Sequence, residues 1–64
     1  MNDLQSLIKT KRLEIGYMQY AVAKRLGMST RNYQRIENEG KKPTEQQLNE
    51  LALIFNCNVA DLRQ

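Results

Sequence analysis

The chain has 64 residues, of which 41% are hydrophobic and 27% are charged, and its formal net charge is +3. This length corresponds to one small domain, too small to hold both a large core and a deep catalytic cleft. The balance of apolar and charged residues is that of a globular chain and excludes a disordered one. No apolar run approaches the roughly 18 residues of a membrane span, and the N-terminus lacks the long apolar segment of a secretory signal.

The residue types that many active sites need are missing. The chain has no His, and Cys57 is its single cysteine. An intrachain disulfide, a zinc site with the usual four ligands and a His-dependent nucleophile are therefore excluded. We expect no enzyme activity, no metal and no cofactor. The single thiol predicts a cytoplasmic protein in which Cys57 is a small core hydrophobe.

Basic residues are concentrated in the first two thirds of the chain. Residues 1–42 hold nine Lys or Arg against four Asp or Glu, whereas residues 43–64 hold one basic and three acidic residues. A basic region on a small globular domain favours a polyanionic partner. The net charge by itself does not outweigh an ordinary solvated surface, so the helix pattern has to decide between the two.

Apolar spacing predicts five short helices and no strand. The first three cover about residues 3–15, 18–26 and 30–38. The fourth begins at Thr44 and ends at Asn56, which can adopt the left-handed conformation, and a last turn follows Asn58. The side chains expected in the core are Leu4, Leu7, Ile8, Ile15, Val22, Ala23, Leu26, Tyr33, Ile36, Leu48, Leu51, Ala52, Phe55, Val59 and Leu62. The hydroxyl of Tyr33 is expected at the edge of this core.

Several helix ends carry local sequence signals. Gly27 follows the second helix, as a glycine in the left-handed region commonly does. Ser29 is a good N-cap for the third helix, and Thr44 with Gln47 has the spacing of a capping box. Asn58 can cap the last turn. These signals predict helix boundaries from neighbouring residues alone.

Residues 19–38 form a pattern of two helices joined by a sharp turn. Gly27 supplies the positive φ of the turn, and Ala23 is small enough for the next helix to cross close by. In that next helix Tyr33 and Ile36 face inward. The outward positions hold Thr30, Arg31, Gln34 and Arg35. Side chains of these types suit the donor and acceptor edges of the DNA major groove.

The chain resembles the helix-turn-helix domain of phage repressors and Cro proteins, the XRE or Cro/C1-type family. The resemblance is carried by Gln19, Ala23, Leu26-Gly27-Met28-Ser29, Ile36-Glu37-Asn38, Leu51-Ala52 and Cys57. It extends from about Leu4 to Leu62 and implies an all-α, five-helix, lambda-repressor-like fold. The whole chain, residues 1–64, is then a single domain with its helix-turn-helix at about 19–38. The third helix is implied to lie in the major groove and the second across the DNA backbone.

The resemblance also implies roles for individual residues. Gln19 is expected to meet a phosphate or an outer base, and Gln34 either joins the DNA contacts or packs beside the turn. Residues expected to face base edges are Thr30, Arg31 and Arg35. Residues expected near phosphates are Asn32, Asn38, Lys41 and Lys42. Arg12 and Glu37 match an ion pair that helps to orient a phosphate contact in some members, and we expect the pair to be structural as well.

Three positions depart from the family pattern. Glu39 stands between Asn38 and Gly40, where the usual sequence is Ile-Glu-Asn-Gly, so the geometry of the following loop is not carried over. Met18 replaces the frequent Ser, Thr or Asn cap of the second helix. Tyr20 replaces a polar residue, and two interpretations stand side by side: contact with a DNA backbone or contact with a protein partner.

The predicted function is that of a sequence-specific, double-stranded DNA-binding transcriptional regulator, a repressor in its usual form. The alternative is a protein-interaction module of the antitoxin or anti-repressor type. A protein-binding helix should be apolar and aromatic on its outer face, whereas residues 30–38 are polar and basic there.

One helix reads only a few base pairs, so we expect a weak homodimer on a pseudo-palindromic operator. Leu53 falls outside the buried stripe of the fourth helix, and with Ile54 and residues 59–64 it forms a candidate dimer contact. The ordinary alternative is that Leu53 is a single exposed leucine.

Overall fold

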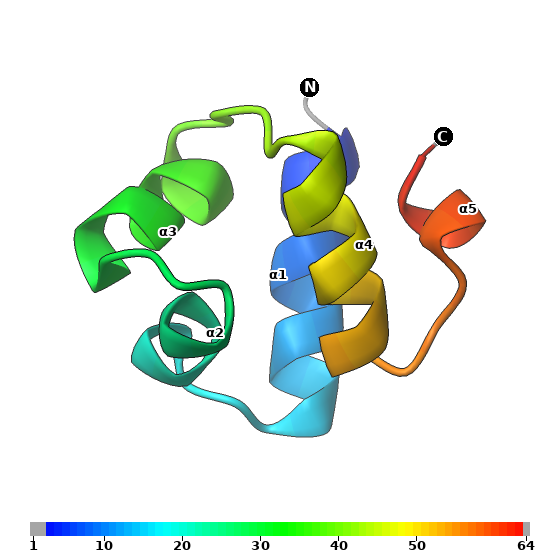
Figure 1. Cartoon of the computed structure of the whole chain (residues 1–64), viewed down its shortest axis with the longest axis horizontal. Coiled ribbons are helices and arrows are strands. Elements are labelled where there is room, and N and C mark those ends of the chain that lie inside the picture. The colour runs from blue at the N-terminus through cyan, green and yellow to red at the C-terminus, as the bar shows by residue number, and fades with distance from the viewer. Residues whose placement is uncertain (1–2, 64) are drawn as a thin grey trace.

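Five helices and no strand make up residues 3–63, the part of the chain that the computed structural model describes (Figure 1). In chain order they are α1 (Asp3–Ile15), α2 (Gln19–Arg25), α3 (Thr30–Asn38), α4 (Glu45–Ile54) and α5 (Val59–Leu62). The predicted all-α class is confirmed. The helix expected over 18–26 is one residue shorter at each end, because Met18 and Leu26 are its caps.

The arrangement of the helices leaves one side of α3 uncovered. α3 packs on α1 and α2, α2 also contacts α4, and α5 contacts α1 and α4. In Figure 1, α2 and α3 therefore lie together on one side of the molecule and α5 lies on the opposite side. α3 is held from one side by two helices, while its other side faces outward.

A single apolar core joins all five helices. Its members are Ile8, Val22, Ala23, Tyr33, Ile36, Leu48, Leu51, Ala52, Phe55 and Leu62. Burial of each large side chain stabilises the fold by about 1.5–3 kcal/mol, so α3 is fixed chiefly through Tyr33 and Ile36. Cys57 is half-buried and packs against the core, as expected. The prediction for Ile15 is wrong, because this last residue of α1 lies beyond the covered stripe and is 40% exposed.

The local signals at the helix ends have mixed outcomes. The capping box is confirmed, since the Thr44 hydroxyl accepts from the Gln47 amide at 3.1 Å and the Gln47 side chain accepts from the Thr44 amide at 2.9 Å. Asn56 adopts the expected left-handed conformation, with a φ of 54°, but α4 itself ends two residues earlier at Ile54, because Phe55 is its C-cap. Asn58 occupies the N-cap position of α5, but its side chain makes no cap bond. Its backbone carbonyl accepts from Asp61 at 2.9 Å instead, so the turn is closed by the main chain.

Candidate nucleic-acid interface

The turn between α2 and α3 positions the start of α3. Gly27 has a φ of 71°, and the Met28 amide donates to the Ala23 carbonyl at 3.0 Å, which closes the end of α2. The Ser29 hydroxyl then accepts from the Asn32 amide at 3.1 Å and caps α3. Ala23 is buried, and its small side chain allows the two helices to cross closely. The predicted helix–turn–helix geometry is thus formed by Gln19–Arg25 and Thr30–Asn38.

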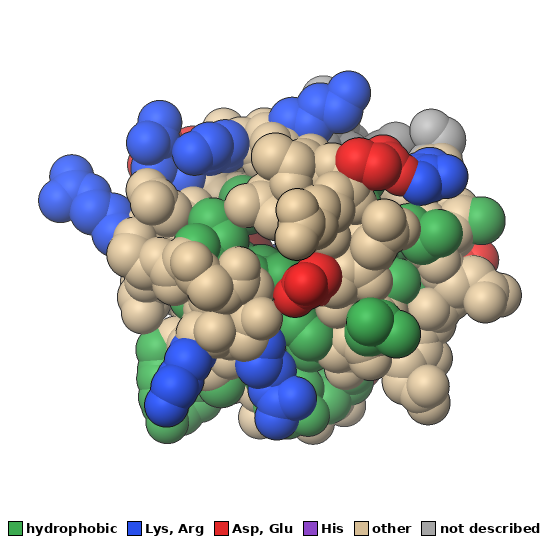
Figure 2. All heavy atoms as spheres, viewed as in Figure 1, with side chains coloured by type: hydrophobic (Ala, Val, Ile, Leu, Met, Phe, Trp, Pro, Cys, Tyr) green, Lys and Arg blue, Asp and Glu red, His purple; other side chains and the backbone are tan. Residues whose placement is uncertain are grey.

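α3 has two different faces. Its buried residues are Tyr33, Ile36 and Glu37. Its exposed residues include Thr30, Arg31, Asn32, Arg35 and Asn38. Viewed as in Figure 1, Lys and Arg side chains project from the left and upper edges of the molecule, where α3 and its connection to α4 lie (Figure 2). The outer face of α3 is therefore exposed, polar and basic.

A buried ion pair ties α3 to α1. The Arg12 Nε lies 2.6 Å from Glu37 Oε2, and Arg12 Nη2 donates to Glu37 Oε1 at 3.0 Å. The third nitrogen, Nη1, donates to the Tyr17 carbonyl at 2.7 Å. Arg12 is 8% exposed and Glu37 is 2% exposed. The expected pair is present, and its two-point geometry fixes both distance and orientation between the helices.

Gln19 and Gln34 extend this pair into a polar network. The Gln19 side-chain amide donates to Glu37 Oε1 at 3.1 Å, and its carbonyl oxygen accepts from the Gln34 amide at 3.2 Å. Gln34 is half-buried. Gln34 is thus bonded to the first residue of α2, and this bond leaves both expectations for Gln34 open. Gln19 links α2 to α3, and each side-chain amide retains a second N–H beyond these bonds.

The network sets the charge states of its members. Burial acts to raise the pKa of Glu37, but hydrogen bonds from Arg12 and Gln19 and the positive charge of Arg12 outweigh it, so the pKa is lowered below its usual range. The hydrogen bond with Glu37 raises the pKa of Arg12. Both groups are therefore charged at neutral pH, and the buried ion pair persists across the ordinary pH range.

Tyr33 differs from the prediction. Its hydroxyl was expected at the edge of the core, but the side chain is fully buried, and the hydroxyl has no hydrogen-bond partner among the described residues. Burial, together with the neighbouring Glu37 carboxylate, raises the pKa of Tyr33. α3 packs against both α1 and α2, and the full burial that results cannot be read from the periodicity of one helix.

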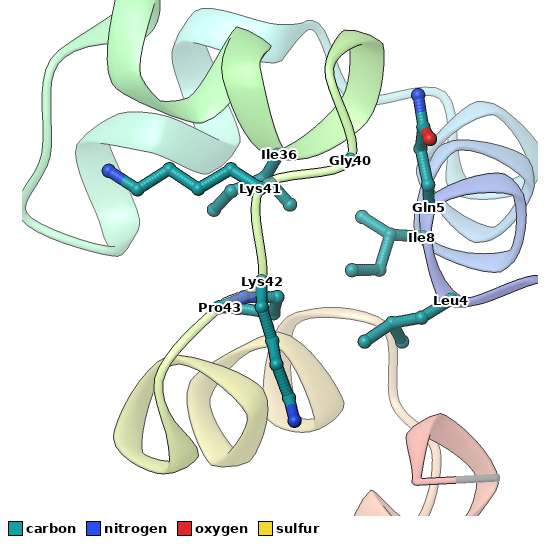
Figure 3. Close-up of a pocket in the computed structure, with 8 residues that line it drawn as sticks. All are labelled: Leu4, Gln5, Ile8, Ile36, Gly40, Lys41, Lys42 and Pro43. Carbon is teal, nitrogen blue, oxygen red and sulfur yellow. The ribbon is translucent and has the colours of Figure 1, made fainter. Parts of the chain in front are cut away.

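The connection from α3 to α4 carries two exposed lysines. Its start is fastened to α3, because the amides of Glu39 and Lys41 both donate to the Arg35 carbonyl, at 3.0 and 3.1 Å. Beneath it is a cavity of about 360 Å³ between the loop and α1, with Leu4, Ile8 and Ile36 in its lining. In Figure 3 the side chains of Lys41 and Lys42 point away from this cavity, and both residues are exposed to solvent.

Two contacts near the interface escaped the sequence reasoning. The Arg35 Nε lies 3.5 Å from Glu39 Oε1, an ion pair between residues four apart on α3 and its C-cap. The i,i+4 spacing of opposite charges was the signal that could have found it. Arg25 stacks on Tyr17, with the guanidinium carbon 5.0 Å from the ring centre. This second contact joins α2 to the α1–α2 loop and has no comparable local signal.

Residues 3–63 contain no group of three or more His, Cys, Asp or Glu that could hold a metal ion. No helix in that range is long and apolar enough to cross a membrane.

The chain matches a known protein family. A family model described as helix-turn-helix, of the XRE/Cro-C1 type, matches residues 8–62. The match includes α2, the turn, α3, the loop with both lysines, and α4 and α5. Neither the curated proteins nor the solved structures gave a match to the chain.

Proposed function

Because the chain belongs to the XRE, or Cro/C1-type, helix-turn-helix family, a family of DNA-binding regulatory domains, we propose that it binds double-stranded DNA sequence-specifically and represses transcription. In this proposal α3 enters the major groove and α2 lies across the backbone. Occupation of the groove excludes other proteins from the same bases, so repression is the regulatory result that binding by itself produces.

The observation that carries the proposal is the division of α3 into an anchored face and an exposed face. Tyr33 and Ile36 lie in the core and Glu37 is held by the polar network, so the helix is rigidly placed. The opposite face is polar and basic. An α-helix fits the major groove, and a rigid helix with such a face can read base edges at little entropic cost.

The proposed contacts divide into base readout and backbone positioning. Arg31 and Arg35 read guanine through their planar guanidinium groups, and Thr30 contacts an adjacent base. Contacts to phosphates come from Asn32, Asn38, Lys41 and Lys42, all of which are exposed. Gln19 and Gln34 contact the backbone or an outer base as a connected pair, since their mutual hydrogen bond fixes both amides.

The Arg12–Glu37 pair is proposed to orient a phosphate contact indirectly. Glu37 accepts from Arg12 and Gln19 on the same oxygen, Oε1, so the amide of Gln19 is placed by the ion pair. An amide held in this way can offer its remaining N–H to a phosphate without further ordering. The pair thus supports the backbone contact at the start of α2 from within the protein.

We further propose that two copies bind a pseudo-palindromic operator as a weak dimer. Half-sites centred about 34–36 Å apart place two recognition helices on one face of the duplex. Leu53 supports the proposed contact, because it is 81% exposed on α4 and stands next to the half-buried Ile54. A dimer contact built on so small a surface would be completed only when both copies are on DNA.

Selection of bound sequences from a random DNA pool, followed by a salt titration on the selected site, tests the proposal. Two lysine–phosphate contacts give log Kobs a slope of about −1.8 per bound copy against log salt, and further contacts steepen it. The matched control is the double variant Arg31→Ala, Arg35→Ala, which should retain binding to random DNA and lose the enriched site. No DNA binding by the wild-type chain at low salt would refute the proposal and favour a protein-interaction module.

A further inference from the structure

Glu39 is an acidic residue placed beside the proposed base-reading face. It forms the C-cap of α3, and its carboxylate pairs with Arg35, with 3.5 Å between Nε and Oε1. The side chain of Arg35 is 49% exposed and that of Glu39 is 66% exposed, so the pair lies at the surface. A negative charge next to a DNA interface repels phosphates, and general binding therefore does not account for it.

The Arg35 main chain is fixed independently of this ion pair. Its carbonyl accepts from the Glu39 and Lys41 amides, at 3.0 and 3.1 Å. These bonds involve no side chain, so they remain when the Glu39 carboxylate is replaced. The adjustable part of Arg35 is its long side chain, which pairs with the carboxylate of Glu39.

The ion pair leaves hydrogen-bond donors of the Arg35 guanidinium available to a base. The contact with Glu39 is made at Nε, and the two Nη groups of the guanidinium fork can still donate two hydrogen bonds to guanine O6 and N7. A flexible arginine loses rotamer freedom when it binds, and a partner that restrains it beforehand reduces this loss.

We propose that Glu39 is a positioning residue that sharpens base discrimination by Arg35 and weakens binding to DNA in general. This inference rests on the proposed function. The carboxylate orients Arg35 toward a base and, by its charge, disfavours alternative contacts of the same guanidinium with phosphates. Discrimination at one base position and affinity for random DNA are therefore expected to change in opposite directions when the charge is removed.

The test compares Glu39→Gln with Glu14→Gln, which removes the same charge from an exposed position on α1. Affinities are measured on the selected operator, on its single-base variants and on random DNA. For Glu39→Gln we expect affinity for random DNA to rise about two- to three-fold, the magnitude of a weak surface ion pair. Discrimination at the base that Arg35 reads should fall by a similar factor, while the other positions keep theirs. Glu14→Gln should leave every discrimination ratio unchanged.

The Arg35→Ala background shows whether the effect passes through Arg35. There, Glu39→Gln should leave the discrimination ratios unchanged, and circular dichroism should show the same folded fraction for both single variants. An unchanged ratio in Glu39→Gln itself would reduce Glu39 to a repulsive charge, and a higher ratio would make it a competitor for Arg35; either result overturns the inference. A wild-type chain that binds no DNA refutes the proposed function, and the inference with it, whereas the first two results leave DNA binding intact.

Discussion

Replacing Glu37 by glutamine leaves the Arg12 guanidinium buried without an anionic partner. A glutamine has a single acceptor oxygen in place of the two carboxylate oxygens. Its NH2 group takes the place of the other oxygen and faces N–H groups of Arg12 or Gln19, which are also donors. Arg12 is 8% exposed, so water cannot replace the lost carboxylate. Removal of one partner from such a pair costs about 3–5 kcal/mol.

This cost is large relative to the total stability of the domain. At about 0.05–0.15 kcal/mol per residue, a chain of this size has a free energy of unfolding of roughly 3–10 kcal/mol. We therefore expect Glu37→Gln to be partly unfolded at 25 °C or to melt tens of degrees lower, since about 1 kcal/mol shifts the Tm of a small domain by about 4–8 °C. Affinity for the operator should fall as well, because a neutral glutamine carbonyl holds the Gln19 amide less firmly than the carboxylate does.

The assay is urea unfolding followed by circular dichroism, combined with a double variant. Arg12→Met with Glu37→Gln removes the buried charge and keeps an acceptor for Gln19, so it should recover most of the stability that the single variant loses. Glu39→Gln is the control for an exposed pair and should change the free energy of unfolding by only about 0.3–0.5 kcal/mol. An unchanged urea midpoint in Glu37→Gln, or a double variant no more stable than the single one, would refute the reasoning.

The same pair determines how stability depends on pH. The pKa of Glu37 is lower in the folded chain than the 4.5 of an unperturbed glutamate. Its contribution is therefore fully present above about pH 4.5 and is lost as the pH falls toward the folded pKa. The wild-type free energy of unfolding should decrease on that acid side, and the profile of Glu37→Gln should be flatter there.

Four other substitutions separate the remaining roles. Arg31→Ala should cost about 1–3 kcal/mol on the selected operator and relax preference at one base, whereas Lys42→Ala should weaken all sequences alike and reduce the salt slope by about one unit; binding isotherms on specific and random DNA distinguish them. Tyr33→Phe removes a buried hydroxyl that has no partner among residues 3–63, so its urea midpoint should be equal to or higher than that of the wild type; a loss above about 1 kcal/mol would show that the hydroxyl is bonded. Leu53→Lys should abolish cooperative binding of two copies, measured as the molecular mass of the protein and of its DNA complex at increasing protein concentration. One copy per operator would exclude the dimer, and cooperative binding by the variant would exclude only the role of Leu53.

Interactions between near neighbours in the chain were readable from the sequence. The capping box of Thr44 and Gln47, the Ser29 cap and the positive φ of Gly27 depend on residues within one turn, and each formed as predicted. Likewise, the apolar stripe that buries Tyr33 and Ile36 follows from helix periodicity, which also exposes the opposite face of α3.

Features that depend on which surfaces meet were settled only by tertiary packing. The sequence could pair Arg12 with Glu37 only through family resemblance, and it placed Gln19 and Gln34 toward DNA without their mutual bond. Ile15 is exposed at the end of α1, whereas the Tyr33 hydroxyl is fully buried. Both outcomes depend on how neighbouring helices cover each position. Periodicity specifies a direction around one helix, whereas burial and hydrogen bonding require a partner surface that is distant in the chain.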